Sequence, residues 1–271
     1  MAQHPFSDSS RHGYADRSDA GRRLAQWLLP LADERPLVLA LPRGGVPVGY
    51  EIAVALHAPL DILFVRKLGA PGQPELGLGA VVDGAQPQRI LNEDLVAVLR
   101  PSAAYLEAEE QRQLALIEER KTRWRKSYPA EPVAGRLVIL VDDGIATGAT
   151  VRVALLALRR SGARRVVLAV PVAPADVLRR LPIDADDFVC PLLPGDLGSV
   201  GQYYDDFSQT SDDEVIGLLD AVRRHLEEDD WPAVSISPPP NVIIQPRPAC
   251  VDSPISTGVC PWPIVFPFPR R

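Results

Sequence analysis

Short, continuous apolar runs alternate along the chain with segments in which apolar residues recur every three or four positions. The continuous runs lie at 37–41, 61–65, 137–141 and 165–170, and each is typical of a strand that is buried on both faces of a parallel sheet. The periodic segments, beginning with 16–31, predict helices that each bury one face. This alternation of strands and helices predicts an α/β fold with right-handed crossovers.

A long insertion interrupts the alternation between the second and third predicted strands. Residues 68–90 contain five glycines and three prolines, so the backbone there is both permissive and interrupted. The pair Asp83-Gly84 is typical of a hairpin turn. Long insertions between buried strands often serve as active-site lids, so we predict a mobile loop or hairpin that covers a site.

A strongly charged segment at 102–126 follows the insertion. Its acidic residues come early and its basic residues late, which suits the dipole of a helix, but its apolar stripe is thin. We therefore expect a helix on the surface or at a contact between subunits. Its basic end, 120–126, could contact nucleic acid, although a solvated helix end is the better interpretation.

The two ends of the chain differ in character from the rest. Residues 1–15 are polar, and we expect them to be mobile. Residues 231–271 contain eleven prolines and no periodicity, so we expect an extended or disordered tail. The remaining residues, 16–230, are then a single domain.

Composition limits the classes of function that the chain can have. Its 271 residues carry a formal net charge of -6, which argues against a surface that attracts nucleic acid throughout, and an anionic ligand would need local positive charge. Three widely spaced cysteines predict neither a disulfide framework nor a zinc site, and the four histidines show no metal-like or triad-like spacing. The sequence shows no signal peptide and no membrane span, so we expect a cytoplasmic protein with no membrane partner.

The strongest chemical signal follows the third predicted strand. There the apolar run ends in Asp142 and Asp143, and a loop of small residues then opens a helix. Small residues allow an oxyanion to approach backbone amides at a helix N-terminus, while the two carboxylates can accept hydrogen bonds from sugar hydroxyls. We therefore predict a sugar-phosphate site. Its predicted phosphate-binding residues are Gly144, Ile145, Ala146, Thr147, Gly148, Ala149 and Thr150.

Two familiar phosphate-binding loops do not fit this stretch. No Lys-Ser or Lys-Thr pair follows Gly148, so the loop is not of the Walker type. Gly77-Leu-Gly79 comes nearest to a dinucleotide-binding loop, but Val82 stands where a third glycine is required. The plain alternative is a strand end with two aspartates that make turn and cap hydrogen bonds. It is less favoured because strand, loop and helix follow in the order that a phosphate site needs.

Two cationic segments follow the first and second predicted strands. Arg43-Gly44-Gly45 combines a forked donor with a backbone that is open to a ligand, and Arg66-Lys67 follow the second strand. We predict the strand order 2-1-3-4, which places the switch point of the sheet between the first and third strands. Ligands bind outside the carboxyl ends of the strands at such a point, so these loops should meet in one crevice.

At this point the sequence resembles a known family. Val-Ile-Leu-Val-Asp-Asp-Gly-Ile-Ala-Thr-Gly-Ala-Thr at 138–150 resembles the phosphoribosyl pyrophosphate (PRPP) motif of type I phosphoribosyltransferases, and Pro-Arg-Gly-Gly at 42–45 resembles their pyrophosphate loop. The resemblance implies a Rossmann-like parallel sheet with flanking helices, a mobile catalytic loop and a small hood. It also implies Mg²⁺-dependent transfer of the phosphoribosyl group from PRPP to a nitrogen nucleophile such as a nucleobase, with release of pyrophosphate, as in nucleotide salvage.

The resemblance also implies a role for each candidate residue. Asp142 and Asp143 would contact the ribose hydroxyls and the nearby cationic charge, and would meet Mg²⁺ only indirectly, through water or those hydroxyls. Pyrophosphate would bind Arg43, Gly44 and Gly45, and the charge of the leaving group would be neutralised by Arg66 and Lys67.

The acceptor of the phosphoribosyl group stays open at this stage. In the family a variable hood selects it, and the candidates here are Val172, Tyr203 and Tyr204. Packing within the hood explains the two tyrosines at least as well as base stacking. Neither the choice between purine and pyrimidine nor a homodimer is decided by these residues.

Three functions remain open. The first is the phosphoribosyltransferase, whose small-molecule acceptor is unknown. The second is a non-catalytic PRPP sensor that acts through a partner or nucleic acid, which a free basic face at 120–126 would favour. The third is a phosphosugar-binding module, which equal affinity for ribose 5-phosphate and PRPP would support.

Overall fold

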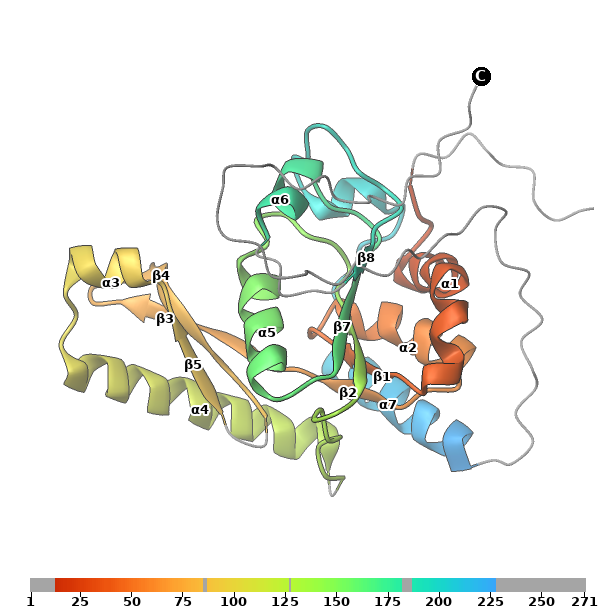
Figure 1. The fold of residues 1–271 in the computed structure, drawn as a ribbon, viewed down its shortest axis with the longest axis horizontal. Coiled ribbons are helices and arrows are strands. Elements are labelled where there is room, and N and C mark those ends of the chain that lie inside the picture. Colours follow the sequence, from red (N-terminus) through yellow and green to blue (C-terminus); the bar gives the residue numbers. More distant parts are fainter. Residues whose placement is uncertain (1–12, 85–86, 127, 182–186, 228–271) are drawn as a thin grey trace, which may run out of the picture.

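The computed structural model describes residues 13–84, 87–126, 128–181 and 187–227, and Figure 1 shows their arrangement. The expectations for residues 1–12 and for the proline-rich stretch 231–271 lie outside the described residues. The expectation of mobility is wrong at residues 13–15, because Tyr14 is buried, its amide donates to the Tyr203 carbonyl at 2.8 Å and its hydroxyl donates to the Pro171 carbonyl at 2.9 Å. None of the helices in these four stretches is long and apolar enough to cross a membrane.

A five-stranded parallel sheet forms the centre of the body, in the order β2-β1-β6-β7-β8. The four main predicted strands stand in the predicted order 2-1-3-4, and β8 is added at the edge. The second run was predicted to continue to Val65, but its strand ends at Ile62. The bounds are β1 Leu37–Ala40, β2 Leu60–Ile62, β6 Leu137–Val141, β7 Arg165–Ala169 and β8 Asp187–Val189.

Alternate residues of the central strands enter two hydrophobic clusters on opposite faces of the sheet. Val38 and Ile139 pack with α1, α2 and α7 on one face, whereas Leu39 and Leu140 pack with α5 on the other. Because helices cover both faces, the central strands β1 and β6 are apolar throughout, as the continuous runs predicted. The bounds are α1 Arg17–Leu28, α2 Gly45–Leu56, α5 Ala149–Arg160, α6 Ala175–Arg180 and α7 Asp212–Glu227, with short 3-10 helices at Leu29–Glu34 and Val200–Tyr203.

A second sheet projects from the body as an arm, which we define as residues 65–125 (Figure 1). Its three antiparallel strands lie in the order β3-β4-β5. The insertion at 68–90 is thus a regular hairpin sheet, in which a register shift beside Gly69 accommodates the glycine-rich backbone. The bounds are β3 Val65–Ala70, β4 Gln73–Val82, β5 Gln88–Leu91, α3 Glu93–Leu99 and α4 Ala103–Arg125.

Helix α4 is packed more deeply than its thin apolar stripe indicated. Ile117 and Trp124 are fully buried, and the ring of Trp124 stacks on Phe64 with 5.4 Å between centroids. Glu109 and Gln113 complete the buried face, because the Gln113 side-chain amide donates to the Glu109 carboxylate at 2.8 Å. Most other positions of α4 are exposed or half-buried, so α4 is the surface helix that was expected, and paired polar residues extend its buried apolar stripe.

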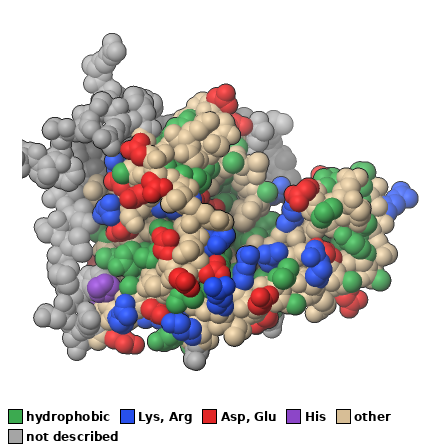
Figure 2. Space-filling model, turned by 180° about the vertical axis from the view of Figure 1, so that it is seen from behind, with side chains coloured by type: hydrophobic (Ala, Val, Ile, Leu, Met, Phe, Trp, Pro, Cys, Tyr) green, Lys and Arg blue, Asp and Glu red, His purple; other side chains and the backbone are tan. Residues whose placement is uncertain are grey.

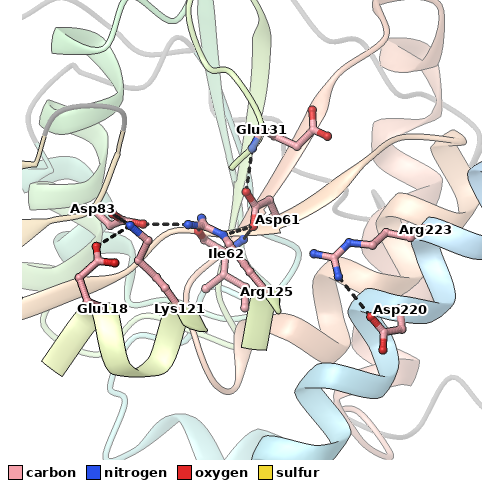
Figure 3. Close-up of polar contacts among 9 residues, drawn as sticks. All are labelled: Asp61, Ile62, Asp83, Glu118, Lys121, Arg125, Glu131, Asp220 and Arg223. Atoms are coloured by element: carbon pink, nitrogen blue, oxygen red, sulfur yellow. Dashed lines mark hydrogen bonds and ion pairs between the residues drawn. The ribbon is translucent and has the colours of Figure 1, made fainter. Parts of the chain in front are cut away.

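Arg125, at the end of α4, joins the arm to the body through a buried ionic cluster (Figure 3). Its guanidinium donates to Asp61 at 2.8 Å, to Asp83 at 3.1 Å and to the Ile62 carbonyl at 2.7 Å. Lys121 approaches the other oxygen of Asp83 at 3.0 Å. We call Arg125, Asp61, Asp83 and Lys121 the Arg125 junction. Its two acids and two bases balance, so this part of the boundary between arm and body is held by complementary charge.

Candidate functional site

Two loops that follow β1 and β6 lie against each other at the carboxyl edge of the sheet. The Leu41 amide donates to the Val141 carbonyl at 2.8 Å. A Cβ atom on Gly44 would overlap the carboxylate of Asp143, and one on Gly45 would lie 2.7 Å from the Val141 carbonyl oxygen. Only glycine therefore permits this approach. The structure thus brings Arg43-Gly44-Gly45 beside the two aspartates, as the sheet order predicted.

Asp142 and Asp143 are held in one compact arrangement. The Asp143 amide donates to the Asp142 carboxylate at 2.9 Å, and Arg17 donates through Nε to the Asp143 carboxylate at 2.8 Å. Burial raises the pKa of Asp142 well above its usual value, and the neighbouring Asp143 charge raises it further. Burial also raises the pKa of Asp143, although Arg17 opposes that shift. The pair is therefore short of positive charge, which suits a site that receives a cationic or hydroxyl-bearing group.

Arg17 is a site residue that the sequence reasoning missed. It stands in the first turn of α1, and its guanidinium also donates to the Ser208 carbonyl at 2.7 Å and lies 3.9 Å from the ring centre of Phe207. Nothing in the local sequence separates it from Arg22 and Arg23 on the same helix. Only the fold shows that Arg17, and not its neighbours, reaches the carboxylate of Asp143.

The loop after the aspartates leads directly into α5. Gly148 is the N-cap residue with φ 76°, and no side chain of the described residues caps this helix end. A positive φ of this size favours glycine. Ala146, Thr147, Ala149 and Thr150 are exposed. The first amides of the helix are therefore open to an anion.

Ile145 differs from the other predicted phosphate-binding positions. Its side chain is buried, and its amide donates to the Val172 carbonyl at 2.9 Å. The neighbouring Gly144 faces two valines, because a Cβ atom there would meet Val172 at 3.0 Å and also contact Val200. Ile145 thus holds the loop in place, and its amide is already engaged.

Arg43 contacts a carboxylate of helix α7. Its Nη1 lies 3.4 Å from an oxygen of Asp212, the first residue of α7, and its side chain is 33% exposed. The Pro42–Arg43 peptide bond is cis. The side chain is thus accessible and only weakly paired.

Arg66 and Lys67 do not lie where the sequence placed them. Because β2 ends at Ile62, they belong to β3 and to the arm. Arg66 donates to the Gln113 side chain at 2.7 Å, and Lys67 donates to the carboxylate of Glu75 at 3.0 Å. Burial lowers the pKa of Arg66, and nearby arginines lower it further. Their described polar partners are arm residues rather than the aspartate loop.

The hood candidates are packed together. Val172 and Tyr204 are buried in one cluster with Tyr14, and Tyr203 is partly buried against it. The Tyr204 hydroxyl donates to the Asp143 carbonyl at 2.5 Å, and the Tyr203 carbonyl accepts from the Tyr14 amide at 2.8 Å. Burial raises the pKa of Tyr204 beyond its ordinary range. This geometry matches the packing interpretation of the tyrosines.

The basic end of α4 is not a free cationic surface. Arg123 pairs with Asp212 at 2.8 Å and Lys126 with Asp220 at 2.6 Å, while Arg125 is buried in its junction. Figure 2 shows basic and acidic side chains interleaved along the lower part of the face that it presents. The observation that would favour a nucleic-acid-linked sensor is therefore absent from this part of the described chain.

Comparisons with known proteins agree with this geometry. A model of the phosphoribosyl transferase domain family matches residues 14–207. Two Mycobacterium tuberculosis proteins, "Putative phosphoribosyl transferase MT0597" and "Putative phosphoribosyl transferase Rv0571c", are 48% identical over 215 residues, which cover 79% of this chain. The match covers 48% of each, so the chain spans about half the length of these curated relatives. The crystal structure of TT1426 from Thermus thermophilus is 43% identical, with a TM-score of 0.67, covering 76% of this chain and 97% of that one.

Proposed function

The chain belongs to the phosphoribosyl transferase domain family, and on this premise we propose that it transfers the phosphoribosyl group of PRPP to a nitrogen nucleophile, with release of pyrophosphate. One observation carries the proposal. The Arg43-Gly44-Gly45 loop and the Asp142-Asp143 loop touch at the carboxyl edge of the sheet, where a Cβ atom on Gly44 would overlap Asp143. A ligand with a phosphate, a ribose and a pyrophosphate could meet both loops at once. A nucleobase is the proposed acceptor.

The 5′-phosphate binds at the start of α5 in this proposal. The exposed positions Ala146, Thr147, Ala149 and Thr150 surround the N-cap Gly148. Backbone amides at a helix N-terminus point at an anion, and the helix dipole adds to the attraction. The hydroxyls of the two threonines supply further donors. The phosphate therefore fixes one end of the substrate.

The aspartates act on the ribose. Their carboxylates accept hydrogen bonds from its hydroxyls, and their negative charge stabilises the positive charge that develops on the ring as the bond to pyrophosphate breaks. Of the two aspartates, Asp142 is the harder to ionise in the empty site, because burial and the charge of Asp143 both raise its pKa. Positive charge that develops on the ribose favours the ionised form of Asp142. The ionised pair is therefore more stable when the transition state is bound than when the site is empty.

Pyrophosphate is received by the forked donors of Arg43 and the open backbone of Gly44 and Gly45. Mg²⁺ would neutralise this leaving group. Mg²⁺ at such sites keeps several waters and is held by substrate phosphates together with one or two carboxylates. Asp142 and Asp143 are the residues that would hold it, through water or the ribose hydroxyls.

Ligand-dependent thermal unfolding tests the proposal without knowledge of the acceptor. At about 100 times the dissociation constant, PRPP with magnesium should add about 2.7 kcal/mol to the free energy of unfolding. The shift should disappear in the Asp142→Asn, Asp143→Asn double variant. Equal shifts with ribose 5-phosphate and PRPP at the same concentration would show equal affinity and indicate a phosphosugar-binding module instead.

A second assay separates an enzyme from a sensor. Pyrophosphate release from PRPP would be measured in the presence of a panel of purine and pyrimidine bases. Release that depends on one base identifies the acceptor. Tight PRPP binding without release for any nitrogen nucleophile would contradict catalysis and favour the sensor.

A further inference from the structure

Asp212, the first residue of α7, uses both carboxylate oxygens to contact arginines of two other elements. Oδ1 lies 3.4 Å from Nη1 of Arg43, and Oδ2 lies 2.8 Å from Nη1 of Arg123 on α4. An acidic first turn is ordinary in a helix because it suits the dipole. The next residue, Asp213, shows that ordinary case, with a side chain that is 94% exposed and 4.0 Å from Arg123.

The two contacts of Asp212 are unequal. A separation of 2.8 Å is typical of a charge-assisted hydrogen bond, whereas 3.4 Å is at the long end of the range. Arg43 has five N–H donors and gives only one of them, weakly, to this carboxylate. Asp212 is thus held more closely by Arg123 than by Arg43. Among the described residues, Arg43 uses one donor on this carboxylate, so most of its donor capacity remains for a ligand.

We propose that Asp212 is an internal counter-anion that competes with pyrophosphate for Arg43, and that Arg123 is a positioning residue that keeps this competition weak. The inference rests on the proposed function, because it takes Arg43 as a pyrophosphate ligand. When an anion docks on Arg43, Asp212 passes wholly to Arg123. Since α4 belongs to the arm and α7 to the body, the affinity of the pyrophosphate loop then depends on how these two helices are placed.

The proposal predicts changes of opposite sign at two residues in contact. Asp212→Asn removes the competing charge, so inorganic pyrophosphate should bind about fivefold more tightly, the factor of a partly exposed charge pair. Arg123→Gln releases Asp212 toward Arg43, so pyrophosphate should bind about fivefold more weakly. A residue that merely anchored α7 would weaken binding when removed and would not produce a gain.

Isothermal titration of the full chain with inorganic pyrophosphate, in magnesium chloride, measures both changes. Asp213→Asn is the matched control, because it removes the same formal charge one residue away from the contact and should leave the dissociation constant within about twofold. Equal effects of Asp212→Asn and Asp213→Asn, or weaker binding in Asp212→Asn, would overturn the inference. If Asp212→Asn does not fold, Arg123→Gln decides, and unchanged binding in that variant overturns the inference.

Arg43→Gln distinguishes the failure of this inference from that of the proposed function. Wild-type binding that is lost in Arg43→Gln supports the pyrophosphate loop, and Asp212 is then judged on its own variants. Absence of pyrophosphate binding by the wild type, or full binding by Arg43→Gln, would overturn the assignment of Arg43 and the inference with it.

Discussion

Two clusters in this protein each contain two aspartates and an arginine whose side chain is no more than 12% exposed. They differ in how many partners their carboxylates have. In the Arg125 junction, the guanidinium donates to Asp61, Asp83 and a backbone carbonyl, and the Glu131 amide donates to the second oxygen of Asp61 at 3.0 Å. At the sugar-phosphate loop, the ion pair of Arg17 is with Asp143, at 2.8 Å, and its other described contacts are with Ser208 and Phe207. Burial raises the pKa of Asp142 beside Asp143.

The difference separates a structural cluster from a functional one. Buried carboxylates with complete partners hold segments together, because removal of any partner leaves a charge uncompensated. Adjacent carboxylates of which only one is paired with an arginine are destabilised in their ionised form until a ligand supplies positive charge or hydroxyl donors. The first cluster should therefore control the stability of the fold, and the second should control ligand binding and turnover.

The largest effect is expected at the junction. Arg125→Met leaves Asp61 and Asp83 buried without their main partner, so the free energy of unfolding should fall by about 3–5 kcal/mol. Urea denaturation measures this change in the free energy of unfolding. The control is Arg89→Met, also on the arm, whose ion pair with Glu110 is partly exposed and should be worth at most about 1 kcal/mol. Equal losses in the two variants would contradict a special role for the junction.

The second effect is on turnover at the sugar-phosphate loop. Asp142→Asn should reduce PRPP-dependent turnover by about 100- to 1000-fold, since the lost charge acts mainly in the transition state. Its free energy of unfolding should not fall, because the variant removes a charge whose burial is unfavourable. Turnover comes from pyrophosphate release and stability from urea denaturation. A large loss of stability in Asp142→Asn with unchanged turnover would contradict the functional role of this pair and indicate a structural one.

A smaller effect should follow from removal of the single cationic partner. Arg17→Gln should weaken PRPP binding about tenfold at neutral pH, because a hydrogen bond to a charged group is worth about 1.5 kcal/mol or more. Arg17 lowers the pKa of Asp143, so the pH above which PRPP binds well should also move upward. Titration calorimetry across a pH series measures both. Arg22→Gln on the same helix, where the side chain is 57% exposed, should change neither.

The smallest effect is the pH dependence of stability. The folded pKa of Asp142 is raised above the usual aspartate value of about 4, so the folded state binds this proton more tightly than the unfolded state does. The free energy of unfolding of the wild type should therefore fall relative to Asp142→Asn as pH rises from about 4 through the folded pKa. A wild-type free energy of unfolding that rises relative to Asp142→Asn over this pH range would contradict the raised pKa.

Much of the fold could be predicted because its signals are local. A continuous apolar run predicts a strand covered on both faces, and alternation with helices then restricts the sheet to few orders. The glycines of both loops were found for the same reason, since close backbone approach needs them whatever lies opposite. Local signals were weakest where the chain changes direction. The run at 61–65 crosses the end of β2 at Ile62, so Arg66 and Lys67 lie on β3, the first strand of the arm, and not directly after β2.

The sequence by itself determined the sheet, its order and the two loops at its carboxyl edge. Only the tertiary structure decided which charges meet. Arg17 and Asp143 are 126 positions apart, and Arg125 and Asp61 are 64 apart. The chain carries 29 basic and 35 acidic residues, and no local pattern says which of them will pair. Pairing depends on which side chains the packed helices bring within hydrogen-bond distance and out of water. These contacts place Asp61 and Asp83 in the Arg125 junction and leave Asp142 and Asp143 as a candidate site.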